Sequence, residues 1–206
     1  SYGLATLEVS TGDYWLSEFH GIQAEASLRD ELARLEPKEL LFPEDLSPDE
    51  QQWTADLTGP RCCAQPATWF DLEQGRMTLQ EQFRVHSMEA FGCHRLTLGI
   101  QAGAAVLRYV RETQPSAPLD HIRPPRVRQD HDAMHLDSVT IRNLELVKPA
   151  GRWDEPSSSR SPYTLLGVLD HTVTAMGSRL LREWLLRPLI TCATIEARLT
   201  AVDEIK

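Results

Sequence analysis

The sequence is most strongly patterned over residues 164–189, where large apolar residues recur at helical spacing. Thr174 is a residue type that caps the first turn of a helix, and Pro188 would end that helix. Between them, four apolar residues would share one stripe of the helix surface. They are Leu180, Leu181, Trp184 and Leu185. The stretch holds no nucleophile, metal-ligand set or phosphate loop, so it predicts a packed helix in a helical domain.

A cluster of prolines near the middle divides the chain into two parts. Residues 114–125 contain four prolines, which break any helix and stiffen a linker. Charge divides at the same place. Residues 1–121 carry 9 Lys/Arg and 19 Asp/Glu, a net −10, whereas residues 122–206 carry 12 and 11, a net +1. We therefore predict a domain boundary near residue 121.

The first part predicts a mixed α/β domain that opens with a β-hairpin. Apolar alternation indicates strands over residues 2–9 and 14–19, joined by turn-forming residues 10–13. The other elements expected there are a helix over 22–35, a strand over 40–42, a surface loop or weak helix over 47–65, a strand over 68–70, and helices over 72–83 and 96–113. From residue 137 the chain is expected to be helical to its end, apart from a solvated loop over 149–162.

Three segments of the second part carry a family resemblance. Residues 165–189 read Leu-Leu-x-x-Leu-Asp-x-Thr-x-Thr-x-Met-Gly-x-Arg-x-Leu-x-x-Trp-Leu-x-x-Pro-Leu. Residues 136–146 contain Arg-Asn-Leu-Glu, and residues 195–204 read Ile-x-x-Arg-Leu-x-Ala-Val-x-Glu. In this order they resemble the start of the core, or lever, domain of the bacterial-type MutS family of DNA mismatch-repair proteins. Residues 2–12 resemble the first strand of that family's connector domain, and residues 118–122 its crossing into the core domain.

The resemblance implies both fold and role. It implies a ribonuclease-H-like α/β connector domain over residues 1–121 and the truncated, all-α start of the lever domain over residues 122–206. The whole protein would recognise mismatched double-stranded DNA as a homodimer, act as an ATPase with ATP and Mg²⁺, and recruit MutL, partly through the connector. The Phe-x-Glu mismatch reader that the family carries in its N-terminal domain is missing here, and so are its Walker loops. We therefore expect a fragment with a non-catalytic structural and allosteric role and no catalytic, cofactor or metal residue of its own, and we assign it no DNA-binding residue.

Two enzymatic readings remain as alternatives. A ribonuclease-H-like nuclease would need converging carboxylates, for which Glu8, Glu25 and Asp71 are the candidates. A zinc site would use His131 and His135, whose spacing resembles a zinc-protease motif but lacks a third ligand. A third reading is an adaptor whose acidic domain binds a basic partner, since an acidic surface repels phosphate backbones.

The remaining features bear on surroundings and surface. No apolar run approaches the roughly 18 residues of a membrane span, so no membrane partner is expected. Four cysteines without zinc-ligand spacing, in a chain with no secretion signal pattern, predict a reducing cytoplasm. Arg123, Arg126 and Arg128 form a basic cluster beside the prolines. The cluster predicts either a phosphate contact or, more commonly, an acid-paired or solvated surface.

Overall fold

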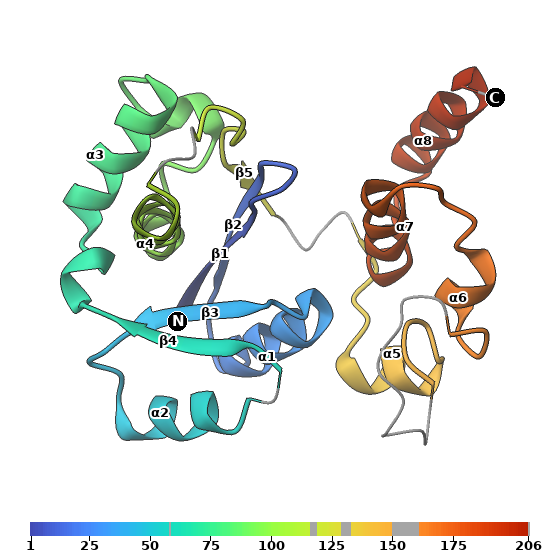
Figure 1. Ribbon diagram of the computed structural model, residues 1–206, viewed down its shortest axis with the longest axis horizontal. Coiled ribbons are helices and arrows are strands. Elements are labelled where there is room, and N and C mark those ends of the chain that lie inside the picture. Colours follow the sequence, from blue (N-terminus) through green and yellow to red (C-terminus); the bar gives the residue numbers. More distant parts are fainter. Residues whose placement is uncertain (58, 116–118, 129–132, 150–160, 206) are drawn as a thin grey trace. The chain divides into compact units, whose positions relative to one another are not determined.

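The computed structural model describes residues 1–57, 59–115, 119–128, 133–149 and 161–205. The chain divides into two compact units, Ser1–Arg128 and Gln129–Lys206. The first unit is mixed α/β, and the regular elements described in the second are helices (Figure 1). The expected domain boundary near residue 121 stays a prediction.

A β-hairpin forms the centre of the first unit. Strands β1 (Tyr2–Glu8) and β2 (Asp13–Phe19) pair antiparallel along their whole length. Gly12 closes the turn with a φ of +73°, a conformation that favours glycine because it has no Cβ. The predicted hairpin is therefore confirmed. Strand β5 (Arg126–Val127) adds to β2 in parallel, giving the sheet order β1-β2-β5.

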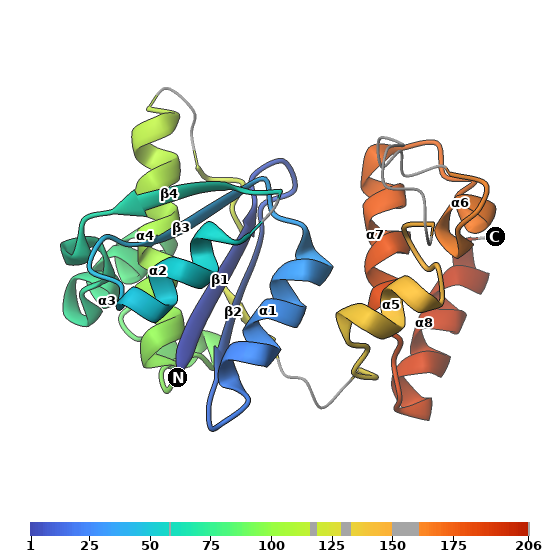
Figure 2. The same cartoon turned by 90° about the horizontal axis from the view of Figure 1, so that it is seen from below.

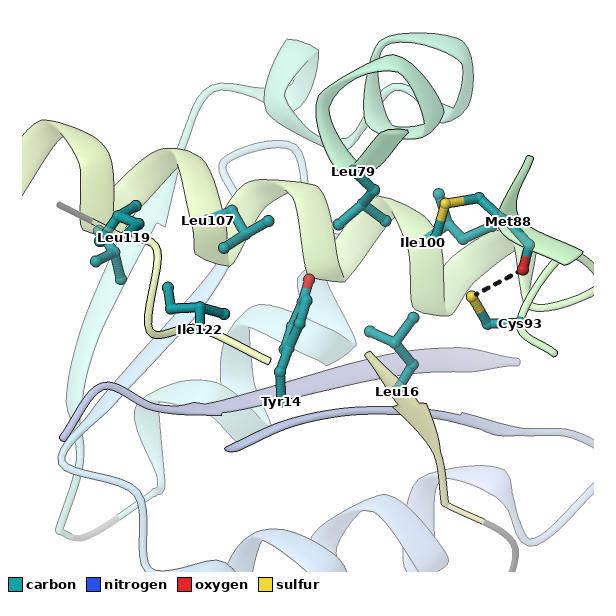
Figure 3. Close-up of a cluster of buried hydrophobic side chains, with 10 residues drawn as sticks. Tyr14, Leu16, Leu79, Met88, Cys93, Ile100, Leu107, Leu119 and Ile122 are labelled. Carbon is teal, nitrogen blue, oxygen red and sulfur yellow. Dashed lines mark hydrogen bonds between the residues drawn. The ribbon is translucent and has the colours of Figure 1, made fainter. Parts of the chain in front are cut away.

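Helices cover both faces of this sheet (Figures 1 and 2). On one face Tyr14 and Leu16 of β2 pack against α3 (Leu72–Phe83) and α4 (Thr97–Thr113). On the other face Phe19 packs against α1 (Ala24–Leu35) and α2 (Pro48–Ala55). Successive side chains of a strand point to opposite faces, so one hairpin supplies both cores. Figure 3 shows the first of these cores, with the Tyr14 ring directed at α4.

The two helices expected over 72–83 and 96–113 are confirmed, but residues 61–70 differ from the prediction. The expected strand over 68–70 is wrong, because Ala67–Phe70 forms a 3-10 turn, η1. Within residues 47–65, expected to be a surface loop or weak helix, α2 agrees with the helical alternative. The strand that follows it, β4 (Arg61–Gln65), was not predicted and lies parallel to β3 (Glu39–Pro43). Strand β4 is mostly exposed and contains no large apolar residue, so it lacks the alternation that reveals strands.

The described part of the second unit has four helices. They are α5 (Ser138–Asn143), α6 (Leu165–Leu169), α7 (Ala175–Leu186) and α8 (Cys192–Ile205). Thr174 caps α7 by accepting a hydrogen bond from the Gly177 amide, as predicted. Most of the expected loop over 149–162 lies outside the described residues.

The apolar stripe of α7 is less covered than the sequence predicts. Leu180 is 48% exposed, and Leu181, Trp184 and Leu185 are only half-buried. The fully buried residue of the helix is Leu186, which packs with Leu136, Ile141 and Leu146. This small cluster covers one end of α7, so most of the stripe lies outside it.

The mixed α/β content agrees with the expected fold class at that level. The sheet of β1, β2 and β5 and the parallel β3–β4 pair are separate in hydrogen bonding. The ribonuclease-H-like label therefore stays a prediction, while the mixed α/β unit followed by helices is observed.

Candidate functional site

The residues that connect the first unit to the rest of the chain are bound closely to its hairpin. We call residues 119–128 the junction segment. Two side chains of its first half, Leu119 and Ile122, are buried in the core between β2 and α4, whereas the residues beside them are exposed. Figure 3 shows both side chains beside Leu107 of α4. The segment is therefore an integral part of the first unit rather than a free linker.

The β1–β2 turn holds the first half of the junction segment. His121 Nε2 lies 2.7 Å from the Val9 carbonyl oxygen, and the Arg123 amide donates to the Gly12 carbonyl over 2.9 Å. The Arg123 guanidinium also donates to Asp13 Oδ1 over 2.8 Å. A Cβ on Gly12 would collide with the His121 carbonyl. Glycine is thus required both by the backbone angle and by the close approach of the segment.

The second half of the junction segment runs along β2. Arg126 and Val127 form β5, and the Arg128 amide donates to the Leu16 carbonyl over 2.9 Å. The Arg128 side chain donates to Glu31 Oε1 over 3.0 Å. Backbone and side-chain bonds therefore continue to the last residue of the unit.

Glu31 of α1 is the acidic centre of a buried ion network. It is 3% exposed, and its second carboxylate oxygen pairs with Arg34, which is also buried. Removing one partner of a buried ion pair typically costs about 3–5 kcal/mol, since it leaves an uncompensated charge. The network thus fastens the end of the junction segment to α1.

The Trp15 ring contacts two arginines of the junction segment, Arg126 and Arg128. The guanidinium carbon of Arg128 lies 4.9 Å from the ring centroid and that of Arg126 lies 5.5 Å from it. Cations over an indole face gain about 0.5–2 kcal/mol, depending on exposure. Of the basic cluster foreseen in the sequence, Arg123 and Arg128 are paired with acids.

The carboxylates proposed for a nuclease have separate local partners. Glu8 accepts from Ser10, Glu25 pairs with Arg29 at 2.7 Å, and Asp71 caps α3 by accepting from the Gln74 amide. In the described ranges, no group of three or more His, Cys, Asp or Glu could hold a metal ion. The nuclease alternative is therefore not favoured by the geometry.

The proposed zinc histidines fall partly outside the described residues. His131 and Asp132 are not described, whereas His135 is exposed just before α5.

The second unit has a polar cluster at the start of α7. Asp170 is buried and accepts from the Thr172 amide, the Thr172 hydroxyl and the Ser178 hydroxyl, at 3.0, 2.5 and 2.5 Å. These polar residues of the 165–189 motif thus hold the segment before α7 against the first turn of that helix.

The Glu31 network was not predicted from the sequence, although the sequence contains a signal for it. Leu28, Leu32 and Leu35 form the inward stripe of α1, and Glu31 lies at the same helical spacing. An acidic residue within an apolar stripe needs a buried partner. The sequence alone could not identify that partner, because Arg128 lies 97 positions away.

Comparisons with known proteins agree with the two-part organisation. The sequence model described as MutS domain II matches residues 1–123, and that of MutS domain III matches residues 139–206. The DNA mismatch repair protein MutS of Roseiflexus castenholzii is 36% identical over 237 residues, covering 98% of this chain and 21% of that protein. The same-named protein of Synechococcus elongatus is 37% identical over 216 residues, covering 99% and 23%. The chain spans between a fifth and a quarter of the length of these relatives. None of the helices in the described ranges is long and apolar enough to cross a membrane.

Proposed function

This chain belongs to the MutS family of DNA mismatch-repair proteins, and from that premise we propose that it is a structural and allosteric element of such a protein. The first unit acts as the connector, and the helical unit is the start of the lever. The junction segment passes displacements of the connector to the chain that follows it. In this proposal the chain performs no chemistry itself.

The continuous attachment of the junction segment is the observation that carries the proposal. A flexible linker would absorb a movement of the first unit before it reached residue 129. A segment held by β5, by the Gly12 turn and by the Glu31 network must move with the sheet. Rigid elements with defined positions are what coupling between distant sites requires.

The remaining functions belong to the whole protein in this proposal. Mismatched double-stranded DNA, ATP with Mg²⁺ and the contacts of the homodimer are assigned to its other domains. The first unit offers a surface to MutL, and its acidic charge suits a protein partner better than a phosphate backbone. Four free thiols agree with a cytoplasmic location. The acidic-adaptor reading is retained only as this partner-binding part of the connector role.

An experiment in a full-length MutS protein carrying these residues tests the proposal. Arg128→Met removes the charge that fastens the junction segment, while Arg34 still neutralises Glu31. We expect the affinity for a mismatched duplex without ATP to stay within about twofold, because no DNA-binding group is removed. The ATP-induced release from that duplex should fall several-fold.

Arg29→Ala is the matched control. Arg29 pairs with Glu25 on the same helix and lies over the Trp53 ring, but this pair is exposed and neither of its residues is bonded to the junction segment among the described residues. It should leave the ATP response unchanged. Hydrogen exchange would establish that the junction segment is loosened in the Arg128 variant. A loosened segment with a normal ATP response would refute the proposed role.

A further inference from the structure

A hollow of about 510 Å³ lies beside the junction segment, on the surface of the first unit. It is lined by Ala90 and Phe91 of η2 (Met88–Phe91) and by residues 123–127. Pro125 is buried, and Phe91 and Val127 are half-buried, so much of the lining is apolar and well supported. Phe91 is held edge-on against Phe83 of α3, with centroids 5.8 Å apart.

Two guanidinium groups belong to the lining of this hollow. Arg123 is 54% exposed at its side chain even though it pairs with Asp13. Arg126 is exposed and lies over Trp15, and it makes no ion pair with an acid in the described part of the chain. The indole face fixes the direction of this cation without neutralising it. The hollow thus combines apolar walls with an available, oriented positive charge.

We propose that the hollow is a docking site for an extended peptide segment of a partner protein, in which a carboxylate stands next to an apolar side chain. The apolar side chain fills the space between Phe91, Pro125 and Val127. The carboxylate accepts paired hydrogen bonds from the Arg126 guanidinium, whose planar fork matches it. This inference rests on the proposed partner-binding role of the first unit and gives the chemistry of one contact.

The surrounding charge favours a peptide over a nucleic acid. Residues 1–128 contain 12 Lys/Arg and 19 Asp/Glu, so the unit carries a net −7. A duplex would bring a row of phosphates against this acidic surface, where only the Arg123 and Arg126 side of the hollow attracts them. A short peptide presents only a few carboxylates, not a continuous row of charges. A sugar-phosphate backbone also offers no apolar side chain for the hollow.

Fluorescence anisotropy with the complete 206-residue chain tests the site. The probe is fluorescein-labelled Gly-Asp-Leu-Asp-Phe-Asp-Gly. One matched peptide replaces each Asp by Asn, and another replaces Leu and Phe by Ala. We expect both matched peptides to bind at least tenfold more weakly than the probe, since each lacks one half of the recognition.

Two variants of the chain assign the binding to the hollow. Arg126→Glu should weaken the probe at least tenfold, and Ala90→Trp should do the same by filling the space. Arg108→Glu is the control, because Arg108 also lies over an indole, 4.7 Å from the Trp69 centroid, but does not line the hollow. It should change the affinity less than twofold. Both arginines are solvent-exposed, and circular dichroism would establish that the variants are folded.

Several results would overturn the inference. Equal binding by the Asp and Asn peptides would show that the site does not recognise a carboxylate. Equal effects of Arg126→Glu and Arg108→Glu would show that the peptide does not bind in the hollow. A 30-base-pair duplex that binds more tightly than the probe, with the same dependence on Arg126, would assign the site to phosphate. If the peptide does not bind as expected but Arg128→Met shows the expected ATP response, only the docking site is refuted. If the peptide binds as expected but Arg128→Met has a normal ATP response, only the coupling role is refuted.

Discussion

Replacing Gly103 of α4 by alanine tests how closely the helix packs on the hairpin. Tyr14 is 1% exposed, and its hydroxyl points at α4 without a hydrogen-bond partner among the described residues (Figure 3). A Cβ on Gly103 would press against that hydroxyl oxygen, well inside van der Waals contact, and would lie 2.9 Å from Leu16 Cδ2. The glycine is therefore needed for space rather than for backbone angle.

The expected magnitude follows from two opposing effects. Overpacking a core costs about 1–3 kcal/mol, while alanine in a helix interior gains about 1 kcal/mol over glycine. Gly103→Ala should therefore lower the free energy of unfolding by about 0–2 kcal/mol. Tyr14→Phe removes an unsatisfied buried hydroxyl, whose burial costs about 1–3 kcal/mol, and should be neutral or stabilising. In the double variant the Tyr14 hydroxyl is absent, so the Gly103→Ala methyl group no longer collides with it. The free energy of unfolding of the double variant should therefore exceed the value expected from adding the two single effects by about 1 kcal/mol or more.

Hydrogen exchange of the α4 amides measures this cycle in the first unit alone, which avoids mixing the unfolding of the two units. Gly99→Ala is the control on the same helix. Its Cβ would lie 3.3 Å from Leu96 Cβ and 3.5 Å from Leu16 Cβ, with no contact to Tyr14 among its three nearest atoms. Its coupling to Tyr14→Phe should be close to zero. If Gly103→Ala and Tyr14→Phe were additive within about 0.5 kcal/mol, the packing argument would be wrong.

Four further predictions follow from the same contacts. Glu31→Ala should cost about 3–5 kcal/mol in urea unfolding because it removes the buried carboxylate that both Arg34 and Arg128 bind, whereas Glu25→Ala, which breaks an exposed pair, should cost about 0–1 kcal/mol. Gly12→Ala should destabilise the first unit and speed the exchange of the Arg123 amide, since its Cβ collides with the segment bonded to the turn. Hydrogen bonds from Thr140 lower the pKa of Asp137, so this carboxylate stabilises α5 above its usual pKa; NMR titration should show that contribution being lost as the pH falls through the lowered value. The chain alone should bind mismatched duplex only weakly, and a sub-micromolar, mismatch-selective affinity in a gel shift would contradict the connector role.

The sequence predicts those elements whose local pattern and tertiary packing agree. The hairpin alternates, its turn contains Gly12, and α4 carries a regular inward stripe, so each is visible without knowledge of the fold. Strand β4 fails for the opposite reason. Its residues are stabilised by hydrogen bonds to β3 and not by burial of large side chains, so nothing in its own composition reveals it.

The candidate site was less predictable than the fold. The sequence placed Arg123 and Arg128 in one cluster and included an acid-paired surface among the alternatives, which is what the structure shows. It gave no means of selecting Asp13 and Glu31 as partners among 19 acids of the first 121 residues. That choice depends on the close approach of residues separated by about a hundred positions, which local periodicity does not encode.

The chemistry of the junction also explains why charged residues are buried there. An apolar set of similar volume would often be as stable as the Glu31, Arg34 and Arg128 network, because desolvation offsets much of the attraction between buried ions. Apolar contacts, however, are non-directional and tolerate small slips. Two guanidinium groups on the two oxygens of one buried carboxylate permit few other arrangements. The network therefore contributes more to the position of the junction segment than to the total stability, and a defined position is what the proposed coupling role would require.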